Sequence, residues 1–232
     1  MTNLDTLLPG TLVERSDWGV TATPGGATRD RDEVVGFTQH HTTGNALGNP
    51  DTTRWVKNIY DYHVETLGWA DIGYAYLYDK HGNVFVGRGR FRTLAHARGF
   101  NRTWLGVAYL GSGVEEQLTR EAKLAGRALH DWLASDGGMT NMRDIKGHRD
   151  QGDTACPGSY LYQWAVELKM PKPEELHVGR FSDVPEDHPF FDDIEELAQD
   201  GVVHGYQDGT YRPEEPMTRA QVASLINRTR NS

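Results

Sequence analysis

The chain contains a single cysteine, Cys156, among its 232 residues. No intramolecular disulfide can form, so the fold must be stabilised by a hydrophobic core and, where suitable ligands exist, by a metal ion. Hydrophobic residues make up 37% of the chain and aromatic residues 10%, which is sufficient for such a core. The length allows one large domain, or a medium domain followed by a smaller one.

The overall charge and hydropathy exclude two classes of partner. The formal net charge is -9, whereas nucleic-acid sites need clustered lysine and arginine, so we expect no nucleic-acid partner. No segment has the ~18 consecutive apolar residues that cross a bilayer, so we expect no membrane association. The opening segment MTNLDTLLPG lacks a basic stretch followed by an apolar run, so we expect no signal peptide.

The acidic residues are unevenly distributed along the chain. Residues 171–232 hold 13 acidic and 6 basic side chains, whereas the preceding part holds 20 and 18. Pro171 and Pro173 interrupt the apolar pattern just before this acidic region, as in a short linker. The sequence therefore predicts a domain over residues 1–170, a linker over residues 171–180 and a small helical module over residues 181–232.

Strand and helix patterns alternate in the first domain. One predicted helix should begin at Asp51 or Thr52 and end at Gly68, and another should bury Leu124, Ala128, Leu129 and Leu133. This alternation predicts an α/β fold with a central mixed β-sheet flanked by helices. The predicted strands cover residues 33–42, 72–79, 83–89 and 104–111, with a last strand around Ile145; the predicted helices cover residues 49–68, 118–138 and 159–169.

The segment GHRDQGDTACPG predicts a metal site. A catalytic zinc ion takes three nitrogen or sulfur ligands and leaves a fourth position to water. His148 lies eight positions before Cys156, and a curved segment can bring both to one ion. Either His40 or His41 can supply the third ligand, but not both, because adjacent side chains on a strand point to opposite faces. The alternative is that Cys156 is a small core residue and the histidines are solvated.

Four segments occur in order within residues 15–165: HHTTGN, DIGYAYLYDKHGNVFVGRG, AHARGFNRTWLGVAYLG and GHRDQGDTACPG. Together they resemble the zinc-dependent N-acetylmuramoyl-L-alanine amidases of the type 2 family, which includes phage lysozyme-type endolysins and peptidoglycan recognition proteins. The resemblance implies a zinc ion bound by His40, His148 and Cys156. It also implies hydrolysis of the amide bond between N-acetylmuramic acid and L-alanine in peptidoglycan.

The resemblance assigns four further residues. Tyr74 matches the family's active-site tyrosine, although a core aromatic is the alternative, and Thr154 matches a position that holds threonine or lysine. Tyr74 is suited to donate a hydrogen bond to a developing oxyanion, and Thr154 to position the water. We also predict that His96 and His41 lie on the substrate side, His96 in the substrate groove. The alternatives are a loop histidine and, for His41, a packing or supporting residue.

Residues 181–228 resemble one S-layer homology motif, in which Thr218 caps the second helix and Gly205 and Gly209 form tight turns. The resemblance implies that Arg219 binds an acidic sugar of a secondary cell-wall polymer. Domains of this kind usually combine three motifs, and one motif leaves apolar helix faces uncovered. We therefore expect self-association, as a trimer, with packing onto the first domain as the alternative. The residues of these faces are Phe190, Ile194, Leu197, Val222 and Leu225.

Three functional hypotheses compete: a peptidoglycan amidase with a wall-binding tail, a recognition module that does not cut, and a surface protein in which the tail is the main functional part. Cys156 favours the amidase, because a pure binder needs no thiolate ligand. Without a signal peptide, a phage endolysin made in the host cytoplasm and released to the cell wall at lysis is the simplest interpretation. A bacterial autolysin exported by another route is the alternative.

Overall fold

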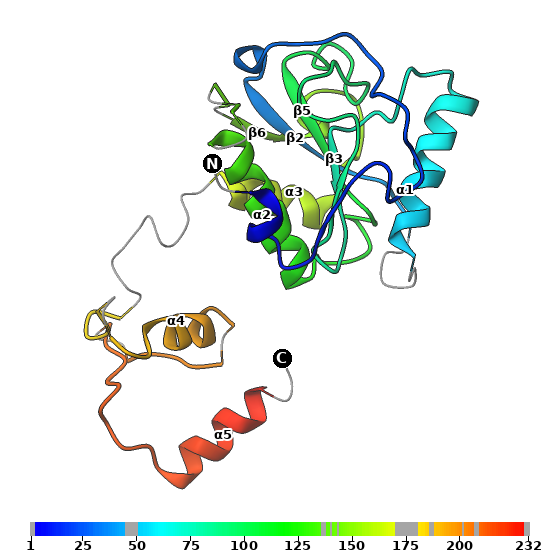
Figure 1. Cartoon of the computed structure of the whole chain (residues 1–232). Helices are drawn as coiled ribbons and strands as arrows, with labels where there is room; N and C mark the ends of the chain where they lie inside the picture. Colours follow the sequence, from blue (N-terminus) through cyan, green and yellow to red (C-terminus); the bar gives the residue numbers. More distant parts are fainter. Residues whose placement is uncertain are drawn as a thin grey trace. The chain divides into compact units, whose positions relative to one another are not determined.

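The computed structural model divides into two compact units, Met1–Met170 and Pro171–Ser232 (Figure 1). The described residues are 3–44, 51–135, 138–139, 141–142, 144–169, 181–185, 188–200, 202–206 and 209–229. The predicted linker, residues 171–180, lies outside them. Within these ranges, no helix combines the length and apolar character needed to span a membrane.

The described residues of the first unit form a six-stranded sheet with the order β1-β4-β3-β5-β2-β6. All paired strands are parallel except β3 and β4, which form the predicted hairpin, closed by the Asp79 N–H donating to the Asn83 carbonyl. The predicted mixed sheet is thereby confirmed; β1 was not predicted. The strands are β1 (Leu12–Val13), β2 (Gly36–His41), β3 (Tyr76–Tyr78), β4 (Val84–Val86), β5 (Trp104–Tyr109) and β6 (Asp144–Gly147).

The helices begin where side chains satisfy free backbone N–H groups. Asp51 accepts from the Arg54 N–H at 2.8 Å, and Thr119 accepts from the Ala122 N–H at 3.1 Å. The first helix ends just before Gly68, whose φ of 70° falls in the left-handed region. The helical segments are η1 (Leu4–Leu7), η2 (Arg31–Glu33), α1 (Thr52–Asp61) with its π-helical extension η3 (Tyr62–Thr66), α2 (Arg120–Ala134), η4 (His148–Asp150) and α3 (Ser159–Leu168).

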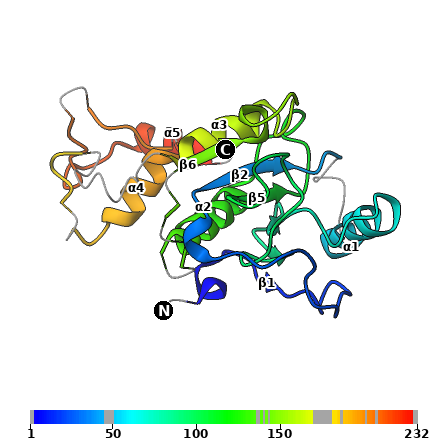
Figure 2. The same ribbon diagram turned by 90° about the horizontal axis from the view of Figure 1, so that it is seen from above.

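The two faces of the sheet are covered by different helices. Figure 1 shows α1 and α2 on opposite sides of the sheet, and Figure 2 shows the same arrangement from above. Tyr76 and Leu105 belong to the core that contains the buried residues of α2 and α3. Leu77 and Ala108 belong to a second core with Val56 of α1. The site-bearing unit is therefore a three-layer α/β structure.

The predicted buried face of α2 was partly wrong. Leu129 and Leu133 are buried, but Leu124 is 45% exposed and Ala128 is only half-buried. The buried face instead includes small residues, because α2 packs closely on the sheet and on α3: a Cβ on Gly126 would lie 3.2 Å from Trp164 Nε1. The remaining buried residues of α2 are Ala122 and Ala125.

The second unit contains α4 (Phe191–Gln199) and α5 (Arg219–Thr229). Its core consists of Phe181, Val184, Ile194, Ala198, Val202 and Val203. No residue of α5 is buried; Leu225 is partly buried against this core, whereas Val222 is 39% exposed. Among the other residues predicted to be apolar contacts, Leu197 is partly buried and Phe190 is 62% exposed.

Local hydrogen bonds define the turns of this unit. Thr218 Oγ1 accepts from the Gln221 N–H at 3.3 Å while Gln221 Oε1 accepts from the Thr218 N–H at 2.8 Å, so the two residues cap α5 reciprocally. The Asp183 carboxylate accepts from the N–H groups of Tyr211 and Arg212, each at 2.7 Å. Short polar contacts of this kind order the loops around a very small core.

Candidate metal centre

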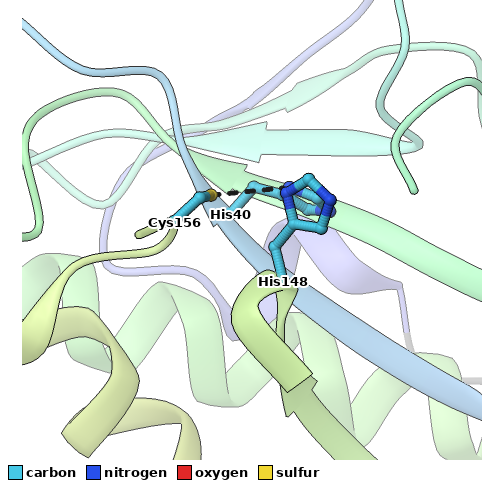
Figure 3. A group of neighbouring side chains, drawn as sticks. All are labelled: His40, His148 and Cys156. Carbon is cyan, nitrogen blue, oxygen red and sulfur yellow. Dashed lines mark hydrogen bonds between the residues drawn. The ribbon is translucent and has the colours of Figure 1, made fainter. Parts of the chain in front are cut away.

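His40, His148 and Cys156 converge, with one ligand atom of each within 4.8 Å of the others (Figure 3). His40 lies at the end of β2, and His148 follows β6 directly. The two strands are parallel neighbours in which Gln39 pairs with Gly147, so the two histidines leave the sheet side by side. The parallel register therefore places two of the three predicted ligands.

The loop before α3 carries Cys156 back to these histidines. The Arg149 N–H donates to the Cys156 carbonyl at 2.8 Å, which joins the two ends of the loop. The Cys156 N–H donates to Thr154 Oγ1 at 3.2 Å, and the Cys156-Pro157 peptide bond is cis. Gly158, with a φ of 86°, redirects the chain into α3. Thr154 thus lies beside the cysteine with its hydroxyl oriented by the loop.

The structure distinguishes between the two adjacent histidines. His40 is 1% exposed and pairs with Ala108, so it lies on the α1 side of the sheet. His41 is half-buried, and its Nδ1 accepts from the Gly113 N–H at 3.2 Å. Alternation along the strand therefore brings only His40 into the group. A substrate contact for His41 stays a prediction.

The spacing of the donors suits a tetrahedral zinc ion. Cys156 Sγ lies 3.7 Å from His40 Nδ1. Bonds of ~2.3 Å to sulfur and ~2.05 Å to nitrogen at a tetrahedral angle place the two donors about 3.6 Å apart. One sulfur and two imidazole nitrogens also form a donor set that zinc prefers.

His96 lies behind His40 and fixes its orientation. His96 Nε2 faces the Trp104 carbonyl at 3.2 Å, so this nitrogen carries the proton and donates. His96 Nδ1 then accepts from His40 Nε2 at 2.9 Å, which leaves His40 Nδ1 unprotonated and directed toward Cys156. Gly106 makes this contact possible, because a Cβ there would lie 2.4 Å from the His96 ring.

This supporting role of His96 was not predicted from the sequence, and its only signal was the glycine in the middle of a buried strand. His96 is 8% exposed and both ring nitrogens face protein atoms. The structure therefore shows a contact with His40, and the predicted contact with the peptide stem remains a prediction.

Burial keeps the histidines of the centre in the neutral form that binds metals. The pKa of His40 lies well below its ordinary value because the side chain is desolvated and because His96 and His148 are close. Burial also lowers the pKa of His148. Burial raises the pKa of the Cys156 thiol to about 11, with the His41 backbone N–H acting in the opposite direction. A bound cation would instead favour the thiolate form of Cys156, because a coordinating thiol is deprotonated.

Tyr74 lies beside the centre. Its ring centroid is 5.2 Å from that of His40 and 5.9 Å from that of His63, which in turn stacks on Trp69 at 4.5 Å. Burial raises the pKa of Tyr74, so its hydroxyl keeps the proton and can donate it in a hydrogen bond. Tyr74 also packs against the core on the α1 side, and its catalytic role stays a prediction.

Arg219, the predicted polymer-binding residue, occupies the first position of α5 and is exposed. It belongs to the second unit, whereas the metal centre belongs to the first.

The family model for N-acetylmuramoyl-L-alanine amidases matches residues 30–159, and the model for the S-layer homology domain matches residues 180–223. The chain belongs to this amidase family and carries an S-layer homology segment at its end.

Curated relatives include peptidoglycan recognition proteins of animals. The chain is 33% identical to peptidoglycan-recognition protein SC2 of Drosophila simulans over 157 residues, covering 66% of this chain and 83% of the relative. It is 32% identical to peptidoglycan recognition protein 1 of Bos indicus over 159 residues, covering 66% and 82%.

Solved structures confirm the fold. Drosophila PGRP-LB matches with a TM-score of 0.61 and 27% identity, over 66% of this chain and 90% of that one. The N-acetylmuramoyl-L-alanine amidase LysC of Clostridium intestinale matches with a TM-score of 0.56 and 26% identity, over 70% and 99%. The relatives thus include both recognition proteins and an enzyme.

Proposed function

We propose that the protein is a zinc-dependent N-acetylmuramoyl-L-alanine amidase that cleaves peptidoglycan. The observation that carries this proposal is the convergence of His40, His148 and Cys156 within 4.8 Å, beside a protonated Tyr74. A module that only binds its ligand needs no such donor set. When bound by these three residues, zinc would supply a Lewis acid and lower the pKa of water toward ~7.

The protein residues would control orientation and charge around the scissile amide. The hydrogen bonds from His40 to His96 and from His96 to the Trp104 carbonyl hold the His40 ring in one tautomer and one orientation. Tyr74 would donate its hydroxyl hydrogen to the oxyanion that develops on the substrate carbonyl. Thr154, which accepts from the Cys156 N–H, keeps its hydroxyl hydrogen to orient the attacking water.

The test measures metal content and amide cleavage together. We expect the purified protein to contain one zinc ion and to release peptides from cell-wall material. Cys156→Ser and His148→Ala should each lose most of both, because two ligands hold the ion poorly. His81→Ala, which changes an exposed histidine outside the centre, is the matched control. Full activity in a metal-free Cys156→Ser protein would exclude the mechanism.

A recognition module without catalysis is the second candidate, because the curated relatives include peptidoglycan recognition proteins. A Drosophila PGRP-LB variant has been solved in complex with tracheal cytotoxin, at 25% identity to this chain and a TM-score of 0.59. Binding of muropeptides without release of peptide ends by the zinc-loaded protein would support this candidate.

We further propose that the protein acts as an endolysin, made in a host cytoplasm and reaching the bacterial wall at lysis, with a bacterial autolysin as the alternative. Lysis of host cells from within, only when a membrane-permeabilising protein is co-expressed, would support the endolysin role.

The C-terminal unit would bind secondary cell-wall polymer through Arg219, and would do so as a trimer that combines three motifs. Its support is the family match and the apolar side chains Val222 and Ile226 of α5, which the described residues of this unit leave 39% and 48% exposed.

A further inference from the structure

A cavity of about 530 Å³ lies on the side of the sheet opposite the metal centre. Tyr76 of β3 and Val86 of β4 line it, and these two residues pair across the hairpin on the side covered by α2. Trp132 of α2 and residues 88–92 also line it. His40 lies on the α1 side, so nothing in the proposed mechanism uses this cavity.

Most arginines around the cavity are engaged in holding the fold. The Arg88 side chain donates from all three of its nitrogens to backbone carbonyl groups. The acceptors of Arg88 are the carbonyls of Ile72, Thr93 and Asp71, at 2.7 to 2.9 Å. Arg92 donates to the Gly26 carbonyl at 3.3 Å. Both residues act as cross-links between loops.

Arg90 differs from these two neighbours. Its guanidinium lies 4.7 Å from the ring centroid of Phe91 and 4.6 Å from that of Trp132, so two aromatic rings hold it in place. It donates only one long hydrogen bond, of 3.3 Å to the Tyr76 hydroxyl, and its Nε is buried with no acceptor in the described part of the chain. A positioned guanidinium with spare donors is suited to receive an anion.

The other lining residues indicate which chemical groups the anionic ligand should carry. Among the described residues that line the cavity, Glu14 is the one acidic side chain, against three arginines, and it is exposed. Leu12, Pro24 and Phe91 add apolar surface, while Thr28 adds a hydroxyl group. The volume falls within the ~300–1,000 Å³ typical of small-molecule sites. A carboxylate attached to small apolar groups and an amide satisfies all of these features, because the arginine fork matches a carboxylate.

We propose that this cavity is a second binding site, which takes the C-terminal carboxylate of a short peptide on the Arg90 guanidinium. The peptide's small side chains contact the apolar wall, and Phe91 and Trp132 flank the ion pair. The site is independent of hydrolysis at the metal centre.

The test is a titration of the full chain, followed by NMR at the Arg90 Nε–H and Trp132 Nε1–H, with N-acetyl-alanyl-alanine as the probe. We expect saturable shifts of both signals. Arg90→Gln should weaken binding at least tenfold, and Arg90→Lys should weaken it less, because the charge remains while the fork is lost. The C-terminal amide of the same dipeptide should bind at least tenfold more weakly than the acid. His148→Ala should leave binding unchanged, which separates this site from the proposed activity.

Arg54→Gln, which removes an exposed arginine from α1, is the charge-matched control and should bind as the unaltered chain does. Equal affinity in Arg90→Gln with a native amide spectrum, or equal binding of the carboxamide, would overturn the proposal. Inorganic phosphate that shifts the same signals with equal affinity would also overturn it, because the site would then be a general anion site. The absence of any shift in the unaltered chain would do the same.

Discussion

The two units of the chain bury their apolar residues to very different extents. In its described part, the first unit covers both faces of a six-stranded sheet with helices, and its larger core cluster contains 23 buried residues. Among the residues of the second unit that the structure describes, six form a buried core, and none of them belongs to α5. The first unit therefore supports a site whose geometry depends on rigid packing, whereas the second is near the lower size limit for an independent core. The same kind of change should have different consequences in the two units.

The largest effect should follow from removing one core phenylalanine in each unit. Phe37 is fully buried in the first unit and Phe181 is 5% exposed in the second, where it packs on Gly205. Each change to alanine should cost ~3–5 kcal/mol of unfolding free energy. We expect Phe37→Ala to lower the melting temperature of a first unit that still folds, and Phe181→Ala to unfold the second unit completely. Limited proteolysis with mass spectrometry of the fragments measures both effects. Equal protease resistance of the second unit in Phe181→Ala and in the unaltered chain would contradict the expected difference between the units.

Tyr74→Phe should act on catalysis without affecting the fold of either unit. Removing one donor to an oxyanion costs about 2.7–4 kcal/mol, a 10²–10³-fold loss of kcat. Zinc content should stay at one ion per chain, because Tyr74 is not among the three grouped donors. The assay is peptide release from cell-wall material by the full chain and by residues 1–170. The ratio of the Tyr74→Phe rate to the unaltered rate should be the same for both lengths. Unchanged turnover would leave Tyr74 with its packing role alone.

His96→Ala should weaken zinc binding by about 10–100-fold, as losses of such supporting partners typically do. The reason is that His40 loses the acceptor that fixes its tautomer. Competition with a metal chelator measures the affinity, and His81→Ala serves again as the control. A zinc affinity equal to that of the unaltered chain would show that packing alone orients His40.

The smallest effect concerns self-association of the second unit. Ile226 is 48% exposed on α5, so Ile226→Asp should shift a weak trimer toward monomers with little effect on folding. Light scattering of the full chain, of the variant and of residues 1–170 gives the masses over a concentration series. If all three are monomers at every concentration and bind walls equally well, the second unit neither assembles nor anchors.

Sequence patterns were sufficient where local physics decides the outcome. Asp51 and Thr218 cap helices because their side chains can accept from nearby N–H groups, and the turn before Asn83 makes the β3-β4 hairpin. Strand and helix alternation predicted the mixed sheet. The ordered motifs predicted the family, which the matched residues 30–159 confirm.

The tertiary structure decided what depends on distant residues meeting. Alternation showed that only one of His40 and His41 could face a metal, but the register of β2 against β5 and β6 determines which. Leu124 is exposed because it lies two residues from Ala122, and at about 100° per residue it points away from the face of α2 that buries Ala122 and Leu129. His96 contacts a residue 56 positions away, and Arg90 meets Trp132 across the fold. The sequence by itself thus determined the local elements and the set of chemical groups, and only three-dimensional packing determined their partners, because those contacts join segments that no local pattern links.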